Sequence, residues 1–268
     1  MSYRFERFRR EHLREGLAFP SGKDPGWQSP DFDLPTTQGG RFRKSDFLGQ
    51  RPLLLAFASL TDPVAASAAS TLKPLYQRFG RDVAFVTVYV RESHPGDHIR
   101  QPATMDWKMR HARMLQDRDA IPWRVAVDDL DGTFHRAFGA RGASAHLLDA
   151  RGNVRFQAVL SNDGRALLRG LEALRAGDGS SWSEGPRLGP ALCGLARTDD
   201  VVRAAGPRAL DDLRRETPLL FAAAEVAWAW RVLTPLGRFA VAAAGAFGAL
   251  AAVALVNGAV LGARRRIV

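Results

Sequence analysis

The residues whose side chains could do chemistry gather at one short turn, Ser59–Pro63, and at a later loop that contains His94 and Asp97. A hydroxyl attacks as a nucleophile when a base takes its proton, and neither Ser59 nor Thr61 has a base beside it in the sequence. Aspartate followed by proline suits the first residues of a helix, because aspartate caps free amide groups and proline fits the first turn. The pair Asp62-Pro63 therefore predicts a helix start rather than a catalytic acid.

The loop with His94, Asp97 and His98 has the residue types of proton-transfer and metal sites. Histidine titrates near neutral pH and binds metal ions, and a carboxylate can orient it. The other interpretation is a polar loop that only keeps its shape. We favour the second, because the helix start offers no nucleophile for such a loop to serve. We accordingly predict neither a metal site nor a cofactor.

The chain has a single cysteine, Cys193, within the segment Pro190–Arg197. One thiol cannot form an intramolecular disulfide, and a zinc site built from cysteines is excluded within one chain. We interpret Cys193 as a small residue packed in a local contact. The alternative is a reactive thiol that exchanges with a partner.

Alternating strands and helices must position these residues. Two continuous apolar runs, Leu53–Ala58 and Val83–Val90, have the composition of strands buried on both faces. The predicted order is strand, helix, strand, helix, strand, helix, hairpin, helix, which places parallel strands in the sheet centre and an antiparallel hairpin at its edge. The other expected elements are a hairpin over Asp31–Phe47, helices at Asp62–Phe79, Asp106–Asp117, Thr133–Phe138 and Asp163–Arg175, and strands at Trp123–Val127, Ala145–Asp149 and Val154–Leu160.

The turn and the loop together resemble the redoxin (AhpC-TSA-like) family, and in pattern most nearly its iodothyronine deiodinase-like members. The resemblance covers about residues 30–175 and rests on Phe57–Pro63, on Val88–Asp97 with its Glu-x-His-x-x-Asp pattern, on Val127–Asp129 and on the hairpin His146–Phe156. It implies an α/β protein with a thioredoxin-like fold, in which a central mixed sheet is flanked by helices.

The same resemblance implies that the family's nucleophile, a cysteine or a selenocysteine, would stand where this chain has Asp62. A carboxylate cannot pass through sulfenic acid or disulfide chemistry. The family's other cysteine position corresponds to Leu60, and the cis-proline position of thioredoxin-like folds to Ser144. The resemblance thus implies a catalytically degenerate pocket. Its vestigial candidates are Ser59, Thr61, Asp62, His94, Asp97 and Ser144.

The segments that flank the expected domain, residues 30–176, differ from it in composition. Residues 1–29 predict a basic amphipathic arm and a loop, without the apolar core of a secretory signal. This arm either contacts an anionic membrane face or packs on its own domain. Residues 177–216 are rich in Gly, Ser, Pro and mixed charges, and predict a linker with one short helix near Asp199–Ala205.

The C-terminal part predicts attachment to a membrane. Phe239–Ala263 contains no charged residue. At ~1.5 Å per residue it is long enough to cross a hydrocarbon core of ~30 Å, and a buried helix of a soluble domain is the less favoured alternative. Residues 237–268 thus predict a transmembrane helix with a basic tail. Residues 217–236 carry Glu225 and predict an interfacial or re-entrant helix, so that one crossing and a two-crossing hairpin both remain open.

The composition narrows the class of partner. A net charge of +10 suits a membrane surface or an acidic partner, and no basic run interleaved with aromatics favours nucleic acid. Gly248, Gly258 and Gly262 permit close approach of a helix from a membrane protein or from a second copy. We expect a protein of the bacterial cytoplasmic membrane with its domain facing the cytoplasm, acting as a structural or interaction module such as an accessory subunit. The alternative is a redoxin-like oxidoreductase that uses a non-cysteine pocket or Cys193.

Overall fold

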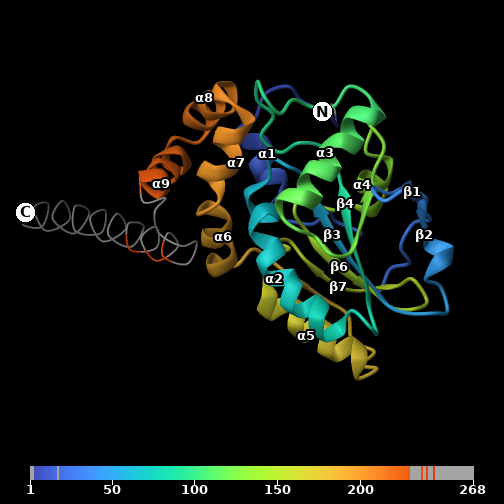
Figure 1. Cartoon of the computed structure of the whole chain (residues 1–268). Coiled ribbons are helices and arrows are strands. Elements are labelled where there is room, and N and C mark those ends of the chain that lie inside the picture. Colours follow the sequence, from blue (N-terminus) through green and yellow to red (C-terminus); the bar gives the residue numbers. More distant parts are fainter. Residues whose placement is uncertain (1–2, 17, 230–236, 238–239, 241–243, 245–268) are drawn as a thin grey trace, which may run out of the picture.

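The computed structural model describes residues 3–16, 18–229, 237, 240 and 244 (Figure 1). Within these residues six strands form one mixed sheet in the order β5-β4-β3-β6-β7-β8. β3, β4 and β5 are parallel, β6 is antiparallel to both β3 and β7, and β8 is parallel to β7. The strands are β3 (Leu53–Ala58), β4 (Ala84–Tyr89), β5 (Arg124–Val127), β6 (Ala145–Leu148), β7 (Val154–Ala158) and β8 (Trp182–Glu184). The architecture is a thioredoxin-like α/β fold with a mixed central sheet.

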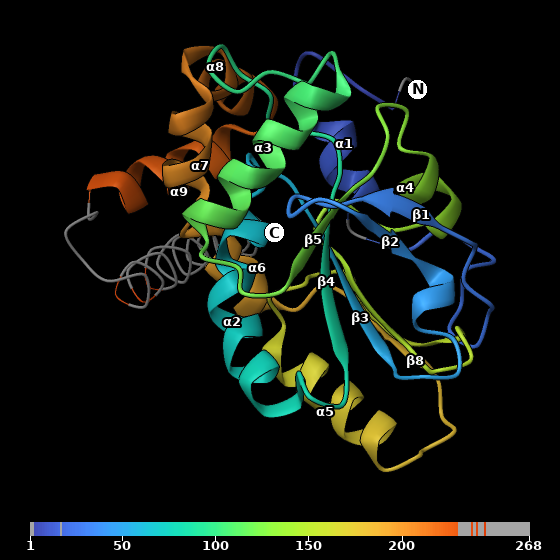
Figure 2. The ribbon, with the colours of Figure 1, turned by 45° about the vertical axis from the view of Figure 1, so that its right-hand side comes forward.

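The two faces of the sheet have different covers (Figures 1 and 2). Along β3, Leu54, Ala56 and Ala58 join one core, which also takes side chains from α2, α3 and α5. Leu53, Leu55 and Phe57 join the other core, which takes side chains from α4 and from the hairpin β1–β2. These elements are α2 (Pro63–Phe79), α3 (Met105–Arg118), α4 (Thr133–Phe138), α5 (Gly164–Arg175), β1 (Asp33–Pro35) and β2 (Arg41–Arg43), with a 3-10 turn η1 at Lys44–Asp46.

The predicted element order between β1 and α5 is confirmed, with boundaries that shift by a few residues at most. The predicted sheet edge is wrong, because β8 pairs with β7 and covers the hairpin that was expected to end the sheet. β8 has three residues, Trp182–Glu184. A run so short shows no alternation of apolar and polar residues from which a strand can be inferred.

The linker predicted for residues 177–216 is also wrong. Besides β8 it contains three helices, and only one of them, near Asp199–Ala205, was expected. Its Gly and Pro residues end and start helices, as Gly206 and Pro207 do between α7 and α8. The linker interpretation followed composition and overlooked the three- and four-residue spacing of the apolar residues in α7 and α8. The helices are α6 (Leu188–Leu195), α7 (Thr198–Ala205) and α8 (Pro207–Glu216). α7 and α8 supply Val201, Val202, Ala205, Ala209 and Leu213 to the α2 side of the core.

The N-terminal arm, residues 3–16, lies against its own domain and contains a single helix, α1 (Arg10–Glu15). The Phe8 side chain is buried in the same core as α2 and α8. The carboxylate of Asp212, on α8, accepts hydrogen bonds from Arg7 Nε at 2.7 Å and from the Phe8 amide at 3.1 Å. The arm therefore adopts the second of its two predicted positions, and a narrow apolar stripe is enough because Asp212 binds its backbone as well.

The C-terminal part of the chain is described only as far as α9 (Pro218–Ala229) and a few isolated residues. The beginning of α9 packs on the domain: Ala224 is buried in the core, and Glu225 forms an ion pair with Arg203. Among the described residues, no helix has both the length and the apolar character that a membrane crossing needs. The run predicted to cross, Phe239–Ala263, lies outside the described residues except for two positions.

Candidate functional site

Asp62 stands at the turn between β3 and α2 and caps that helix, as the sequence predicted. Its Oδ1 atom accepts hydrogen bonds from the amides of Val64 at 2.9 Å and Ala65 at 3.1 Å. Its Oδ2 atom accepts one from the Ser93 hydroxyl at 2.8 Å. Burial raises the pKa of the Asp62 carboxyl, because desolvation disfavours its charged form.

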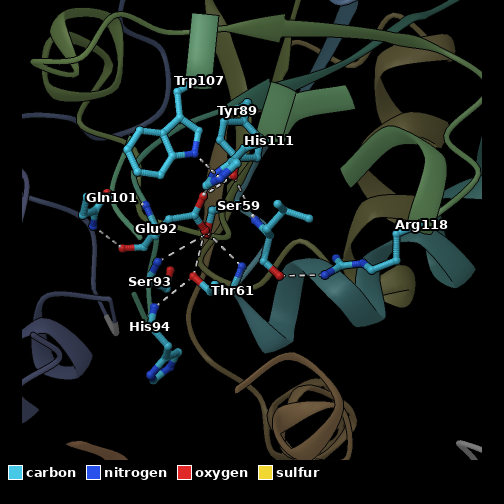
Figure 3. Close-up of polar contacts among 11 residues, drawn as sticks. Ser59, Thr61, Tyr89, Glu92, Ser93, His94, Gln101, Trp107, His111 and Arg118 are labelled. Carbon is cyan, nitrogen blue, oxygen red and sulfur yellow. Dashed lines mark hydrogen bonds and ion pairs between the residues drawn. The ribbon is translucent and has the colours of Figure 1, made fainter. Parts of the chain in front are cut away.

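Directly behind this turn lies a buried carboxylate, Glu92, at the centre of a hydrogen-bond network (Figure 3). Its Oε2 accepts from the Thr61 amide at 3.1 Å and from the Thr61 hydroxyl at 2.8 Å. Its Oε1 accepts from the Tyr89 hydroxyl and from Nδ1 of His111 at 3.0 Å. Burial raises the pKa of Tyr89, so the phenol keeps its proton and donates it. Each oxygen of Glu92 therefore has two donors.

The network also fixes the proton on His111. The indole of Trp107 can only donate, and its Nε1 lies 2.8 Å from Nε2 of His111. Nε2 must therefore accept, which places the hydrogen of this imidazole on Nδ1, where it points at Glu92. Trp107 and His111 are four residues apart and share one face of α3. The side-chain amide of Gln101 binds the backbone of Glu92 twice. Its Oε1 accepts from the Glu92 amide at 3.0 Å, and its Nε2 donates to the Glu92 carbonyl at 2.8 Å.

His94 belongs to the same loop but faces the other way. Its backbone amide donates to the Thr61 hydroxyl at 3.0 Å, while its ring points away from Glu92 (Figure 3). The ring is buried against Phe8 of the arm, with 4.3 Å between ring centroids. Its Nδ1 atom is buried and has no hydrogen-bond partner. Burial lowers the pKa of His94 to about 4, so the ring is neutral at physiological pH.

The structure brings some of the predicted site residues together and separates others. Ser59, Thr61, Asp62 and His94 share the turn, where Ser59 Oγ accepts from the Ser93 amide at 3.3 Å. Asp97 turns away and accepts from the Arg208 amide at the start of α8, at 2.8 Å. The less favoured alternative, in which His94 and Asp97 act together, is therefore not formed by these contacts. In the described part of the chain, no set of His, Cys, Asp and Glu residues is arranged to bind a metal ion.

Ser144 and Cys193 lie on either side of this turn. The Ser144 carbonyl accepts from the Phe57 amide at 2.9 Å, and its hydroxyl lies 3.0 Å from Nε2 of His146. The carbonyl therefore extends the pairing of β3 with β6, while the buried hydroxyl bonds the backbone of Arg141 and closes the turn before β6. Cys193 is exposed on α6, so it is not the packed residue that the sequence predicted. Desolvation raises the pKa of its thiol, which makes the thiol a poorer nucleophile.

A cavity of about 380 Å³ opens in front of Asp62 and His94. Its polar lining includes Asp62, Ser93 and His94, and most of the rest is apolar. The N-terminal arm supplies part of this apolar wall and the C-terminal helices supply another part. These wall residues include Phe5, Phe8, Leu13, Leu192, Leu195, Leu213 and Leu220. An apolar cavity with a few polar groups at one end is the usual form of a small-molecule site.

The sequence of this chain is similar to known proteins over the region that contains the Glu92 network. The family model for iodothyronine deiodinase matches residues 19–155, which is half of the chain. The chain belongs to the iodothyronine deiodinase family. Thyroxine 5-deiodinases from Ovis aries and Homo sapiens are both 28% identical over 125 residues, which is 43% of this chain. The aligned part spans about two fifths of these relatives, 42% and 40% of their lengths.

Solved structures with similar folds include thiol-dependent redox proteins. Peroxidoxin BcpB from Mycobacterium tuberculosis is 20% identical, with a TM-score of 0.44 over 57% of this chain and 97% of its own. A putative thiol:disulfide interchange protein DsbE from Chlorobium tepidum is 24% identical, with a TM-score of 0.44 over 56% of this chain and 97% of its own. At this level the likeness concerns the fold alone.

The family match includes the Glu92 network but only part of the cavity lining. The arm, residues 3–16, precedes the matched range 19–155, and α5 to α9 follow it. Of the network, the sequence analysis quoted Glu92 in a motif but gave it no role, and it missed Tyr89 and His111. The spacing of Trp107 and His111, on one helix face with a Glu in the preceding loop, is the signal that could have revealed them.

Proposed function

We propose that this chain is a deiodinase-family domain that has lost thiol and selenol chemistry and serves as a membrane-attached structural or interaction module. The observation that carries the proposal is Asp62. It occupies the position of the family's nucleophile, and the structure uses its carboxylate as the cap of α2. The single thiol of the chain, Cys193, lies on a helix outside the family match.

The Glu92 network is consistent with a structural role. It binds the Thr61 amide and hydroxyl, and so fixes the turn that presents position 62 at the edge of the cavity. A buried network with all its donors and acceptors paired makes a backbone rigid, whether or not a reaction follows.

The activity test uses the purified full chain in mild detergent. We expect no reduction of peroxide with thioredoxin or dithiothreitol, and no deiodination of an iodothyronine. Asp62→Cys in a Cys193→Ser background is the positive control, since it returns a thiol to the helix start, where thiol pKa values fall. Iodoacetamide should alkylate this variant. Turnover that survives Cys193→Ser in the natural chain contradicts the proposal and favours chemistry by a non-cysteine pocket; turnover that Cys193→Ser abolishes favours Cys193.

We also propose that Phe239–Ala263 attaches the module to the bacterial cytoplasmic membrane, with the domain on the cytoplasmic side. The support is the uncharged sequence of this run. α9 leads toward it and exposes the large apolar side chain of Leu219, as an interfacial helix would. Gly248, Gly258 and Gly262 offer the close-packing face for a membrane partner or a second copy.

Carbonate extraction of membranes tests the attachment. The natural chain should stay in the pellet, and Leu250→Arg with Val253→Arg should release it, because each charge costs about 2.5–3.5 kcal/mol near the centre of a bilayer. Release of the natural chain by carbonate contradicts the proposal. Cysteine labelling at Gly237 and Val268, in a Cys193→Ser background, separates one crossing from two: only a hairpin exposes Gly237 outside while Val268 stays protected.

A further inference from the structure

The cavity in front of Asp62 has an acceptor-rich end and an apolar body. The Asp62 carboxylate is buried, and its three hydrogen-bond donors in the described structure are two backbone amides and one hydroxyl. None of these donors carries a positive charge. Buried carboxylates are usually paired with a cation, because desolvation of an unpaired charge is costly. Oδ2 of Asp62, next to Ser93, lines the cavity in which such a cation could sit.

A second polar group at this end of the cavity also lacks a partner. Nδ1 of His94 is buried without a hydrogen bond, in a side chain that is 8% exposed. Because burial keeps this ring neutral, one of its nitrogens offers a lone pair. The Ser93 hydroxyl, which donates to Asp62, can accept in turn. The lining of the cavity therefore combines a carboxylate without a cationic partner among the described residues, a hydroxyl and a neutral imidazole.

We propose that this cavity binds a small apolar molecule that carries a primary ammonium group, with the ammonium held by Asp62, Ser93 and His94. An ammonium has three N–H donors and one positive charge. It would supply the positive charge that the other partners of Asp62 lack, and N–H donors for the Ser93 hydroxyl and the His94 imidazole. The aliphatic and aromatic walls from the arm and from α6 to α9 would enclose the body of the molecule.

Positively charged side chains also line this cavity, but they are held toward the arm. Arg91 donates to the Tyr3 carbonyl at 2.6 Å, and its guanidinium lies over the rings of Tyr3 and Phe5. Arg141 donates through Nε to the Ala18 carbonyl. Neither forms an ion pair with Asp62 in the described structure, so in this proposal the ammonium supplies the positive charge at the carboxylate.

The proposal deepens the proposed function, on which it rests only in treating Asp62 as a permanent carboxylate. It assigns this chain a ligand whose cavity is walled in part by the arm and by C-terminal helices, which lie outside the family match. Redox turnover and amine binding are separate measurements on one preparation. Peroxide turnover would contradict the proposed module function, whether or not the amine binds. Absence of amine binding would contradict only this inference.

Isothermal titration of the full chain in detergent, with three ligands of one skeleton, tests the inference. The ligands are 2-phenylethylamine, 2-phenylethanol and phenylacetate. We expect the amine to bind with one-to-one stoichiometry, at least about tenfold tighter than the alcohol or the acid. Equal or tighter binding of the alcohol or the acid overturns the proposal, and so does absence of amine binding up to about 10 mM.

Two variants locate the site. Asp62→Asn keeps the oxygen that caps α2 and loses the charge, so amine affinity should fall about tenfold while alcohol affinity stays the same. A methyl group at Gly142 would lie 3.4 Å from Oδ2 of Asp62, which is ordinary contact distance. Gly142→Ala should therefore be tolerated, whereas Gly142→Leu should fill the space beside the carboxylate and abolish binding. Amine binding that neither Asp62→Asn nor Gly142→Leu weakens also contradicts the proposal.

Discussion

The two sides of the turn between β3 and α2 treat buried polar groups in opposite ways. On the sheet side, Glu92 receives four hydrogen bonds and its partner His111 is bonded at both ring nitrogens. On the cavity side, the described residues supply no cationic partner to Asp62 and no hydrogen-bond partner to Nδ1 of His94. A complete network contributes stability and a fixed shape, whereas incomplete groups around a cavity are what a ligand can complete. The difference separates what holds the fold from what remains available for binding.

Replacement of Glu92 should lower the free energy of unfolding more than any of the other substitutions discussed below. Glu92→Gln places an amide NH₂ group opposite either the Thr61 amide or the Nδ1–H of His111, neither of which can accept, and so breaks at least one buried charged hydrogen bond. We expect the free energy of unfolding of the full chain to fall by about 2–4 kcal/mol, measured by urea unfolding. His94→Gln is the matched change on the cavity side and should cost less than about 1 kcal/mol. Similar losses for both variants would contradict the distinction between the two sides.

The cavity wall depends on the bond between the arm and α8. Asp212→Asn removes the charge that binds Arg7 Nε and the Phe8 amide, and should release the arm from the domain. We expect deuterium uptake in residues 3–13 to become about tenfold faster, because local opening sets the exchange rate. The neighbouring Asp211→Asn is the control, since Asp211 is exposed and pairs only at 3.8 Å with Arg215. An unchanged exchange rate in Asp212→Asn would show that apolar contacts alone hold the arm.

Buried neutral histidines should make the stability depend on pH. Burial lowers the folded-state pKa of His94 to about 4 and of His135 and His146 to about 3, from 6.5 in an exposed ring. The unfolded chain therefore binds protons first, and stability is lost as the pH falls from about 6.5 toward 4. The slope is at most about 1.4 kcal/mol per pH unit for each histidine.

Urea midpoints at several pH values between 7 and 4.5 measure this slope. Asp62 acts in the opposite direction, because its raised pKa lets the folded state bind a proton as the pH falls. His94→Gln should reduce the slope by about a third, since one of three similar groups is removed. A flat pH profile would mean that the three rings take up protons without opening the structure.

The smallest effect is expected at Asp62 itself. Asp62→Asn should change the free energy of unfolding by less than about 0.5 kcal/mol, because asparagine caps a helix as well as aspartate does. Asp62→Ala removes both bonds to the Val64 and Ala65 amides and should cost about 1 kcal/mol. Thermal unfolding of the two variants side by side is the measurement. A large loss in Asp62→Asn would show that the carboxylate charge itself supports the fold.

The sequence predicted the central fold well, for a physical reason. Runs such as Leu53–Ala58 are buried on both faces, so burial alone determines their residue types. Asp62 followed by Pro63 is likewise a local signal with a local cause. β8 and α6 could not be predicted in this way, because each is short and packs on residues that are distant in the sequence, β8 on β7 and α6 on the start of α2. The spacing of the apolar residues in α8 was a local signal that composition concealed.

The site was predicted less completely. The turn residues were found because they stand together in the chain, but Glu92 receives donors from three separate elements. The directions of the side chains could not be predicted either. His94 and Asp97 stand three residues apart, yet His94 lines the cavity and Asp97 accepts a hydrogen bond from the start of α8. A linear motif gives the residues and their spacing, and the backbone of the loop decides where each of them points.

The position of Asp212 also sets an order of events during synthesis. Arg7 and Asp212 are separated by 205 residues, so the arm is made long before the carboxylate that binds it. α2, the sheet and Asp62 can assemble while the arm is still free, and the cavity stays open to solvent through most of translation. Its wall can close only when α8 has emerged, shortly before the uncharged run that begins at Phe239. A molecule that binds in front of Asp62 therefore has access to the nascent chain before the arm closes over it.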